Sequence, residues 1–173
     1  KHIIIANRDD KESHKFLALP VGKKITFGAD DASPFSTSEN GSEFTWRGKK
    51  ISLKLPGEFN IYNALAAATF AESVDVPHDA IVRALLKFSV VRGRMERIDE
   101  GQDFTVIVDY AHTPDSLDRA YGVYAHARKL CILGGTGGGR DIWKRKAMGE
   151  IAAKHCAHVI LTTEDPYDEP PEK

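Results

Sequence analysis

The chain has 173 residues, a length that allows one domain or two small ones. Its 24 basic and 25 acidic residues give a net charge of −1, so a general electrostatic attraction to nucleic acid or to an anionic membrane is excluded. The two cysteines and the lack of an apolar run of membrane-spanning length predict a cytoplasmic protein with reduced thiols. Because the chain opens inside a predicted strand and ends just after another, we expect a fragment of a longer protein.

The N-terminal half predicts short strands and two helices. An exposed loop rich in Asp, Ser and Pro is expected at 30–40, and a hairpin is expected around Arg47-Gly48. The other expected elements are strands at 3–6 and 24–28, a weak helix at 11–19, and helices at 60–72 and 77–88. The helix at 60–72 is the strongest because of its alanines.

Asn60 and Asn63 lie one helical turn apart at the start of this strong helix, so their amides project from the same face. One interpretation is that Asn60 is only an N-cap residue. Alternatively, the two amides could hydrogen-bond the donor and acceptor edge of a purine.

The C-terminal half predicts three apolar strands, at 105–108, 129–133 and 158–162, separated by helices that begin near Pro114 and at Trp143. This alternation indicates an α/β fold, βαβαβ, with a parallel sheet covered on both faces. Polar clusters at 109–115, 134–141 and 164–165 then fall at the carboxyl ends of the strands, where ligands bind in open α/β sheets.

The glycine-rich stretch at 134–139 matches neither a P-loop nor the G-x-G-x-x-G dinucleotide pattern. Its backbone N–H groups could still hold an anion, with positive charge added by Arg140, Lys144 and Arg145, or the glycines could serve only a tight turn. His112 could bind a ligand or only hydrogen-bond its own turn. Arg94 and Glu96, in an extended linker at 89–97, could pair, contact a ligand or remain solvated.

A metal site is not predicted. His155, Cys156 and His158 cluster near a helix end, but no further Cys or His pair with ligand spacing completes a zinc site.

Taken in order, the motifs resemble those of the Mur ligases of peptidoglycan synthesis, and the resemblance covers nearly the whole chain. The matching stretches are Asn7-Arg-Asp-Asp10, Gly57-Glu-Phe-Asn-Ile-Tyr-Asn63, Gly93-Arg-Met-Glu96, Val108-Asp-Tyr-Ala-His-Thr-Pro-Asp115, Gly134 to Arg145, and Thr162-Thr-Glu-Asp-Pro166. Within the family, the pattern is similar to that of the ligases that add a third, diamino, residue to UDP-N-acetylmuramoyl-L-alanyl-D-glutamate.

The resemblance implies that residues 1–90 are the last part of a central ATPase domain. Residues 91–173 would then be the first βαβαβ part of a Rossmann-like C-terminal domain. It also implies ATP and Mg²⁺ as cofactors, a P-loop and most magnesium ligands upstream of this chain, and an inactive fragment. In the family reaction ATP phosphorylates the D-glutamyl carboxylate, and the incoming amine attacks the acyl phosphate.

The resemblance also implies roles for single residues. The candidates for nucleotide binding are Asn60, Asn63, Arg94, Asp109, Tyr110 and His112. The candidates for binding the amino-acid substrate are Arg140, Lys144, Glu164, Asp165 and Tyr167. No metal ligand and no catalytic residue is assigned within the chain.

One position departs from the family pattern. Ligases that use meso-diaminopimelate carry Asp-Asn-Pro-Arg, whose Arg engages the distal carboxylate, whereas this chain has Glu164-Asp-Pro-Tyr167. Tyr167 has no positive charge, and the two acids could attract a distal ammonium, so L-lysine is expected to be favoured over meso-diaminopimelate. Two other classes stay open: a ligase like folylpolyglutamate or cyanophycin synthetase, and a non-catalytic nucleotide-binding module.

Overall fold

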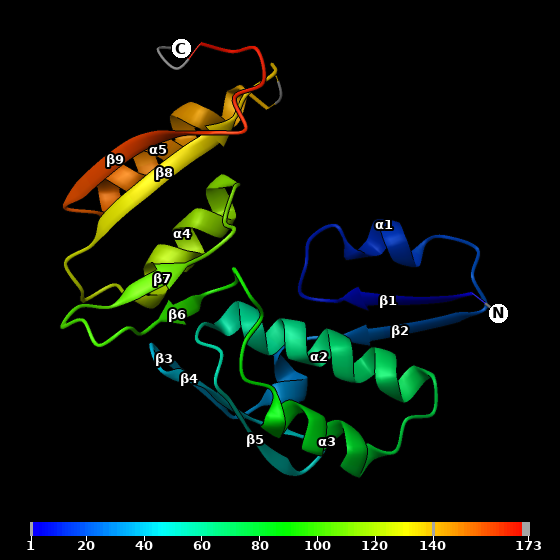
Figure 1. The fold of residues 1–173 in the computed structure, drawn as a ribbon. Helices are drawn as coiled ribbons and strands as arrows, with labels where there is room; N and C mark the ends of the chain where they lie inside the picture. The colour runs from blue at the N-terminus through cyan, green and yellow to red at the C-terminus, as the bar shows by residue number, and fades with distance from the viewer. Residues whose placement is uncertain (1, 140, 171–173) are drawn as a thin grey trace. The chain divides into compact units, whose positions relative to one another are not determined.

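The computed structural model describes residues 2–139 and 141–170. The chain divides into two compact units, residues 1–92 and residues 93–173 (Figure 1). Each unit is mixed α/β, as the sequence predicts.

The first unit contains two small sheets and two long helices. Strands β1 (Ile3–Asn7) and β2 (Lys23–Phe27) pair directly and in parallel, and the short helix α1 (Ser13–Leu17) connects them in the sequence. Strands β3 (Phe35–Ser38), β4 (Gly41–Trp46) and β5 (Lys49–Leu53) form an antiparallel sheet, after a 3₁₀ turn at Ala29–Ala32. Helices α2 (Glu58–Ser73) and α3 (His78–Lys87) follow.

The core of the first unit lies between the antiparallel sheet and these helices. Phe44 of β4 and Ile51 of β5 are direct cross-strand partners and are 2% and 0% exposed. Ile61 and Leu65 on α2, one helical turn apart, are buried in the same cluster. Alternating residues of each strand and one face of α2 therefore supply the apolar surface whose burial stabilises the unit.

The hairpin expected around Arg47-Gly48 is confirmed. Arg47 and Gly48 have φ of 48° and 76°, so both central residues adopt the left-handed conformation that a two-residue hairpin turn with right-handed strand twist requires. Glycine adopts this conformation without steric cost.

The prediction of an exposed loop at 30–40 is wrong in part. Residues 35–38 form the edge strand β3, whose register with β4 runs from Phe35 opposite Phe44 to Ser38 opposite Gly41. All four β3 residues are exposed, so their composition is that of a loop. The strand forms because the backbone of β4 offers it hydrogen-bonding partners, a signal absent from the local sequence.

The second unit contains β6 (Glu96–Ile98), β7 (Val106–Val108), α4 (Pro114–Val123), β8 (Leu130–Thr136), α5 (Trp143–His155) and β9 (His158–Glu164). The predicted βαβαβ order and the bounds of α5 are confirmed. Strands β8 and β9 pair in parallel, from Leu130 opposite His158 to Thr136 opposite Glu164. The strands therefore extend further than expected, and the first two glycines of the glycine-rich stretch belong to β8.

Two features of the predicted sheet are wrong within the described residues. First, β7 pairs antiparallel with β6 instead of joining β8 in one parallel sheet, because the extended linker folds back beside it. Second, only one face of the β8–β9 pair is covered. Cys131 is 6% exposed, whereas its neighbour Ile132 and the paired Ile160 are 69% and 48% exposed.

Candidate functional site

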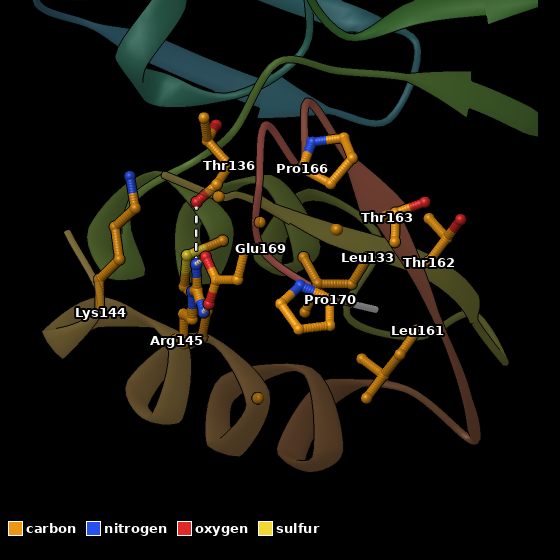
Figure 2. Close-up of a pocket in the computed structure, with 15 residues that line it drawn as sticks. Leu133, Thr136, Lys144, Arg145, Leu161, Thr162, Thr163, Pro166, Glu169 and Pro170 are labelled. Atoms are coloured by element: carbon orange, nitrogen blue, oxygen red, sulfur yellow. Dashed lines mark hydrogen bonds and ion pairs between the residues drawn. The ribbon is translucent and has the colours of Figure 1, made fainter. Parts of the chain in front are cut away.

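A cavity of about 280 Å³ lies at the carboxyl edge of the β8–β9 pair (Figure 2). Its walls are the ends of β8 and β9, the first turns of α5, and the segment 166–170 that follows β9. Thr162 and Thr163 are among the lining residues, and Lys144 and Arg145 contribute positive charge. The cavity therefore lies at the edge where ligands are expected in an α/β protein.

The residues predicted to bind an amino acid are distributed unevenly around this cavity. Lys144 lines it, with a side chain 11% exposed and its Nζ 3.4 Å from Asp141 Oδ2. Glu164 ends β9, and the Asp165 carbonyl accepts a hydrogen bond of 3.1 Å from the Gly137 N–H. The lining includes Pro166 but neither of these acids nor Tyr167, whose side chain is 67% exposed. Arg140 lies outside the described residues.

Arg145 joins three segments of the site. Its Nη1 and Nη2 donate to the two carboxylate oxygens of Glu169 at 2.6 and 2.8 Å, and Nη2 also donates to the Thr136 carbonyl at 3.1 Å (Figure 2). This two-bond pairing fits the planar guanidinium to the carboxylate. The hydrogen bonds that Arg145 donates to Glu169 raise the pKa of Arg145, although desolvation opposes that rise.

The glycine-rich turn lies in close contact with the segment after β9. A Cβ on Gly137 would overlap the Pro166 carbonyl, with 2.7 Å to the carbonyl carbon. A Cβ on Gly138 would lie 3.2 Å from the Tyr167 ring. The lack of a side chain at Gly137 therefore allows the two backbones to approach, which is a structural use of this glycine.

A second group of candidate residues gathers at the end of β7. The Arg94 guanidinium lies 4.7 Å from the centroid of the Tyr110 ring, and the rings of Tyr110 and His112 are 4.8 Å apart. His112 Nδ1 lies 2.9 Å from the Tyr110 carbonyl oxygen, so the histidine does hydrogen-bond its own turn. An arginine thus lies over a phenol ring, and an imidazole lies beside that ring at a tilt of 55°, on an exposed surface of the second unit.

Asp109 connects β7 to the start of β6. Its Oδ2 accepts from the Met95 N–H at 2.7 Å, and its Oδ1 accepts from the Ala111 N–H at 2.8 Å. Glu96 accepts from the Gly93 N–H at 2.7 Å, while the neighbouring Arg94 lies over Tyr110. These contacts fix the backbone from which Arg94 projects.

In the first unit, Asn60 and Asn63 interact with each other. Helix α2 is capped by Gly57, so the interpretation of Asn60 as the N-cap residue is wrong. Asn60 is 9% exposed; its Nδ2 donates to the Pro56 carbonyl at 2.8 Å, and its Oδ1 accepts from Asn63 Nδ2 at 3.1 Å. The buried amide of Asn60 therefore holds the loop before α2 and orients the exposed amide of Asn63.

Sequence reasoning missed Glu169 and Thr136. Glu169 lies in an acidic, proline-containing stretch, and its partner Arg145 is 24 residues away, so no local pattern indicates the pair. The Thr136 contact uses a backbone carbonyl, which side-chain chemistry does not predict.

The cluster near the end of α5 does not form a metal site in the part of the chain that the structure describes, where no three His, Cys, Asp or Glu side chains come together. His155 Nε2 instead lies 2.8 Å from Asp118 Oδ1 on α4. This hydrogen bond lowers the pKa of Asp118. Among the same residues, no helix has the length and apolar character needed to cross a membrane.

The fold and the cavity define an α/β protein with a candidate ligand site at the carboxyl ends of two parallel strands. Residues 1–71 match the Mur ligase middle domain, and residues 93–173 match the Mur ligase glutamate ligase domain. The chain belongs to the Mur ligase family.

Similar proteins agree with this membership. The chain is 38% identical to the UDP-N-acetylmuramoyl-L-alanyl-D-glutamate--2,6-diaminopimelate ligase of Caldanaerobacter subterraneus, over 100% of the chain and 38% of that protein. It is 46% identical to the Syntrophomonas wolfei protein of the same name, over 96% of the chain and 36% of the relative. MurF from Acinetobacter baumannii has the same fold, with a TM-score of 0.76, 22% identity, and coverage of 92% of this chain and 38% of that one. The chain thus spans little more than a third of the length of these proteins.

Proposed function

We propose that this chain is part of an ATP-dependent ligase that adds a diamino acid to UDP-N-acetylmuramoyl-L-alanyl-D-glutamate in peptidoglycan synthesis. The observation that carries the proposal is the cavity at the carboxyl edge of β8 and β9. It is lined by Lys144 and Arg145 and bordered by the segment that begins at Glu164. The names of the relatives, which specify 2,6-diaminopimelate as the added amino acid, support the nucleotide-sugar dipeptide as the acceptor substrate. A cytoplasmic location belongs to the proposal.

In this proposal the cavity receives the incoming amino acid. Arg140 binds its carboxylate, since a guanidinium forms two parallel hydrogen bonds with a carboxylate, and Lys144 adds positive charge nearby. The amine then attacks the acyl phosphate formed from the glutamyl carboxylate, and phosphate leaves. The role of the cavity is to hold the amine in place for this attack.

Candidate contacts to the nucleotide lie within each unit by itself. In the first unit Asn63, oriented by Asn60, hydrogen-bonds the adenine; in the second, Asp109 binds the ribose hydroxyls. Each carboxylate oxygen of Asp109 accepts one backbone N–H, and a carboxylate has capacity for further donors. Arg94, supported by the rings of Tyr110 and His112, contacts the phosphates.

Magnesium is implied by the use of ATP, since it neutralises phosphate charge in phosphoryl transfer. The described residues contain no group of three or more His, Cys, Asp or Glu side chains that could hold a metal ion by themselves. We therefore assign the Mg²⁺ ligands to other parts of the protein and derive no step through the ion.

The charges around the cavity favour L-lysine over meso-diaminopimelate as the added amino acid. Lys144 and Arg145 are the cationic residues in the described lining, and both already pair with carboxylates, those of Asp141 and Glu169. Tyr167 replaces the arginine that meets a distal carboxylate in diaminopimelate ligases. Glu164 and Asp165 add negative charge at the end of β9, which suits a distal ammonium.

The test uses the full-length protein and measures ATP-dependent phosphate release with the nucleotide-sugar dipeptide. L-Lysine, meso-diaminopimelate and L-ornithine are supplied one at a time, with L-norleucine as the control that keeps the lysine carbon chain but lacks its ammonium. We expect release that requires both substrates and is fastest with L-lysine. Phosphate release that does not need the dipeptide would contradict the ligase. So would the absence of phosphate release with every one of these amino acids.

The variant Tyr167→Arg tests the selectivity separately. Restoring a cation at this position should raise kcat/KM for meso-diaminopimelate relative to L-lysine. A wild-type preference for meso-diaminopimelate would overturn the lysine assignment and leave the ligase intact.

A further inference from the structure

Arg145 is the side chain that ties the segment after β9 to the rest of the site. The segment begins at Glu164, opposite Thr136 in the β8–β9 register, and Glu169 binds the Arg145 guanidinium five residues later. The side chains of Arg145 and Glu169 are 28% and 17% exposed, so the pair is shielded from water more than most ion pairs of the chain. Both ends of the segment are therefore fixed.

The path between these two ends is also held. The Gly137 N–H donates to the Asp165 carbonyl at 3.1 Å, and the Glu169 N–H donates to the Pro166 carbonyl at 3.0 Å. Asp165 and Tyr167 have φ of 39° and 54°, a conformation that non-glycine residues adopt at a cost and that surrounding contacts must maintain. The position of Tyr167 thus depends on contacts at both ends of its segment.

We propose that Arg145 is a positioning residue for amino-acid selectivity: by binding Glu169 it holds the segment that carries Glu164, Asp165 and Tyr167 beside the cavity. The Nη1–Nη2 edge of its guanidinium is occupied by Glu169, and Nη2 also donates to the Thr136 carbonyl (Figure 2). Arg145 therefore acts through the segment and not on the substrate. This inference rests on the proposed function, because it takes the segment to border the amino-acid site.

The pairing also decides which acids act on the substrate. Glu169 is matched by the Arg145 charge at 2.6 Å, so its effect on a ligand in the cavity is largely cancelled. Glu164 and Asp165, next to Tyr167, are the acids that we assign to a distal ammonium. Loss of Arg145 should therefore both loosen the segment and release one additional negative charge at the cavity.

The first experiment compares steady-state kinetics of the full-length protein with the variants Arg145→Gln, Arg145→Lys and Glu169→Gln. Mutation of a residue that orients a metal ligand typically lowers affinity or activity by about 10–100-fold. By analogy, the KM for the amino acid should rise about tenfold or more in Arg145→Gln and Glu169→Gln. The KM for ATP should stay within twofold. Arg145→Lys keeps the positive charge but cannot form the two parallel hydrogen bonds. Its KM for the amino acid should therefore lie between those of the wild type and of Arg145→Gln.

The double variant Arg145→Gln/Glu169→Gln should be no worse than either single variant, because both remove the same contact. Lys146→Gln is the matched control. It removes a cation from the adjacent position of α5, where the side chain is 88% exposed and 3.9 Å from Glu150, and should change neither KM. An unchanged amino-acid KM in both single variants, or an equal rise in the KM for ATP, overturns the proposal.

Hydrogen exchange provides a readout that does not require activity. In Arg145→Gln and Glu169→Gln the amides of Gly137 and Glu169 should exchange faster, while those of β4 and β5 in the first unit stay unchanged. Unchanged exchange at both amides overturns the positioning role even if the wild-type protein releases no phosphate. The proposed function and this inference can therefore fail separately.

Discussion

The close contact between Gly137 and Pro166 makes Gly137→Ala a direct test of the geometry of the site. The added Cβ would overlap the Pro166 carbonyl, with 2.7 Å to its carbon and 3.0 Å to the Pro166 Cα. These are backbone atoms, so they cannot avoid the methyl group by a rotamer change. Overpacking of this kind costs about 1–3 kcal/mol, because the segment must shift to relieve it.

The assay is native-state hydrogen exchange of the β8 and β9 amides in the full-length protein. A loss of about 1–3 kcal/mol corresponds to exchange faster by about 5–150-fold. Gly135→Ala, two residues earlier in β8, is the matched control, since its Cβ would lie 3.9 Å from Arg145 Cγ, an ordinary contact. Equal exchange rates in the two variants would contradict the close contact between Gly137 and the backbone of Pro166.

Three further predictions concern the packing and charge of the two units. Leu65→Ala, at a position 1% exposed, should destabilise the first unit by about 2–5 kcal/mol, measured by exchange of the β4 amides, whereas Phe70→Ala, at a position 60% exposed, should have a much smaller effect. Thr113→Ala should cost α4 about 1 kcal/mol, read from its amide exchange, because the Thr113 hydroxyl accepts from the Ser116 N–H at the N-cap. Burial raises the pKa of Asp31, but the hydrogen bonds from Arg8 and from the backbone N–H at residue 28 outweigh this and lower it overall. The stabilisation from Asp31 should therefore be present above about pH 4 and be lost as the pH falls through the lower folded pKa. Asp31→Asn should flatten this part of the dependence of the free energy of unfolding on pH. An unchanged pH dependence in the variant would contradict the role of Asp31.

The local sequence predicted those elements that are specified by their own residues, through periodicity or turn preference. Helix α5 runs from Trp143 to His155 as expected, and the hairpin turn at Arg47-Gly48 is specified by the left-handed preference of its glycine. The glycine-rich stretch and the acidic end of β9 were placed at one edge because parallel strands bring their carboxyl ends together.

The remaining features depend on partners that are distant in sequence. Strand β3 has the composition of a loop and forms through pairing with β4, and β7 pairs with the linker strand β6 instead of β8. The Arg145–Glu169 pair spans 24 residues and has no periodic signature. In each case a partner distant in sequence decides the outcome, and local propensity does not.

In the proposed reaction, ATP activates the glutamyl carboxylate for attack by the diamino acid. Its most direct test is to supply the full-length protein with UDP-N-acetylmuramoyl-L-alanyl-D-glutamate labelled with ¹⁸O in the side-chain carboxylate, together with ATP and L-lysine. An acyl phosphate transfers one carboxylate oxygen to the phosphate that leaves, so we predict one ¹⁸O atom in each released phosphate. Unlabelled phosphate would contradict the ligase mechanism that we propose for this chain.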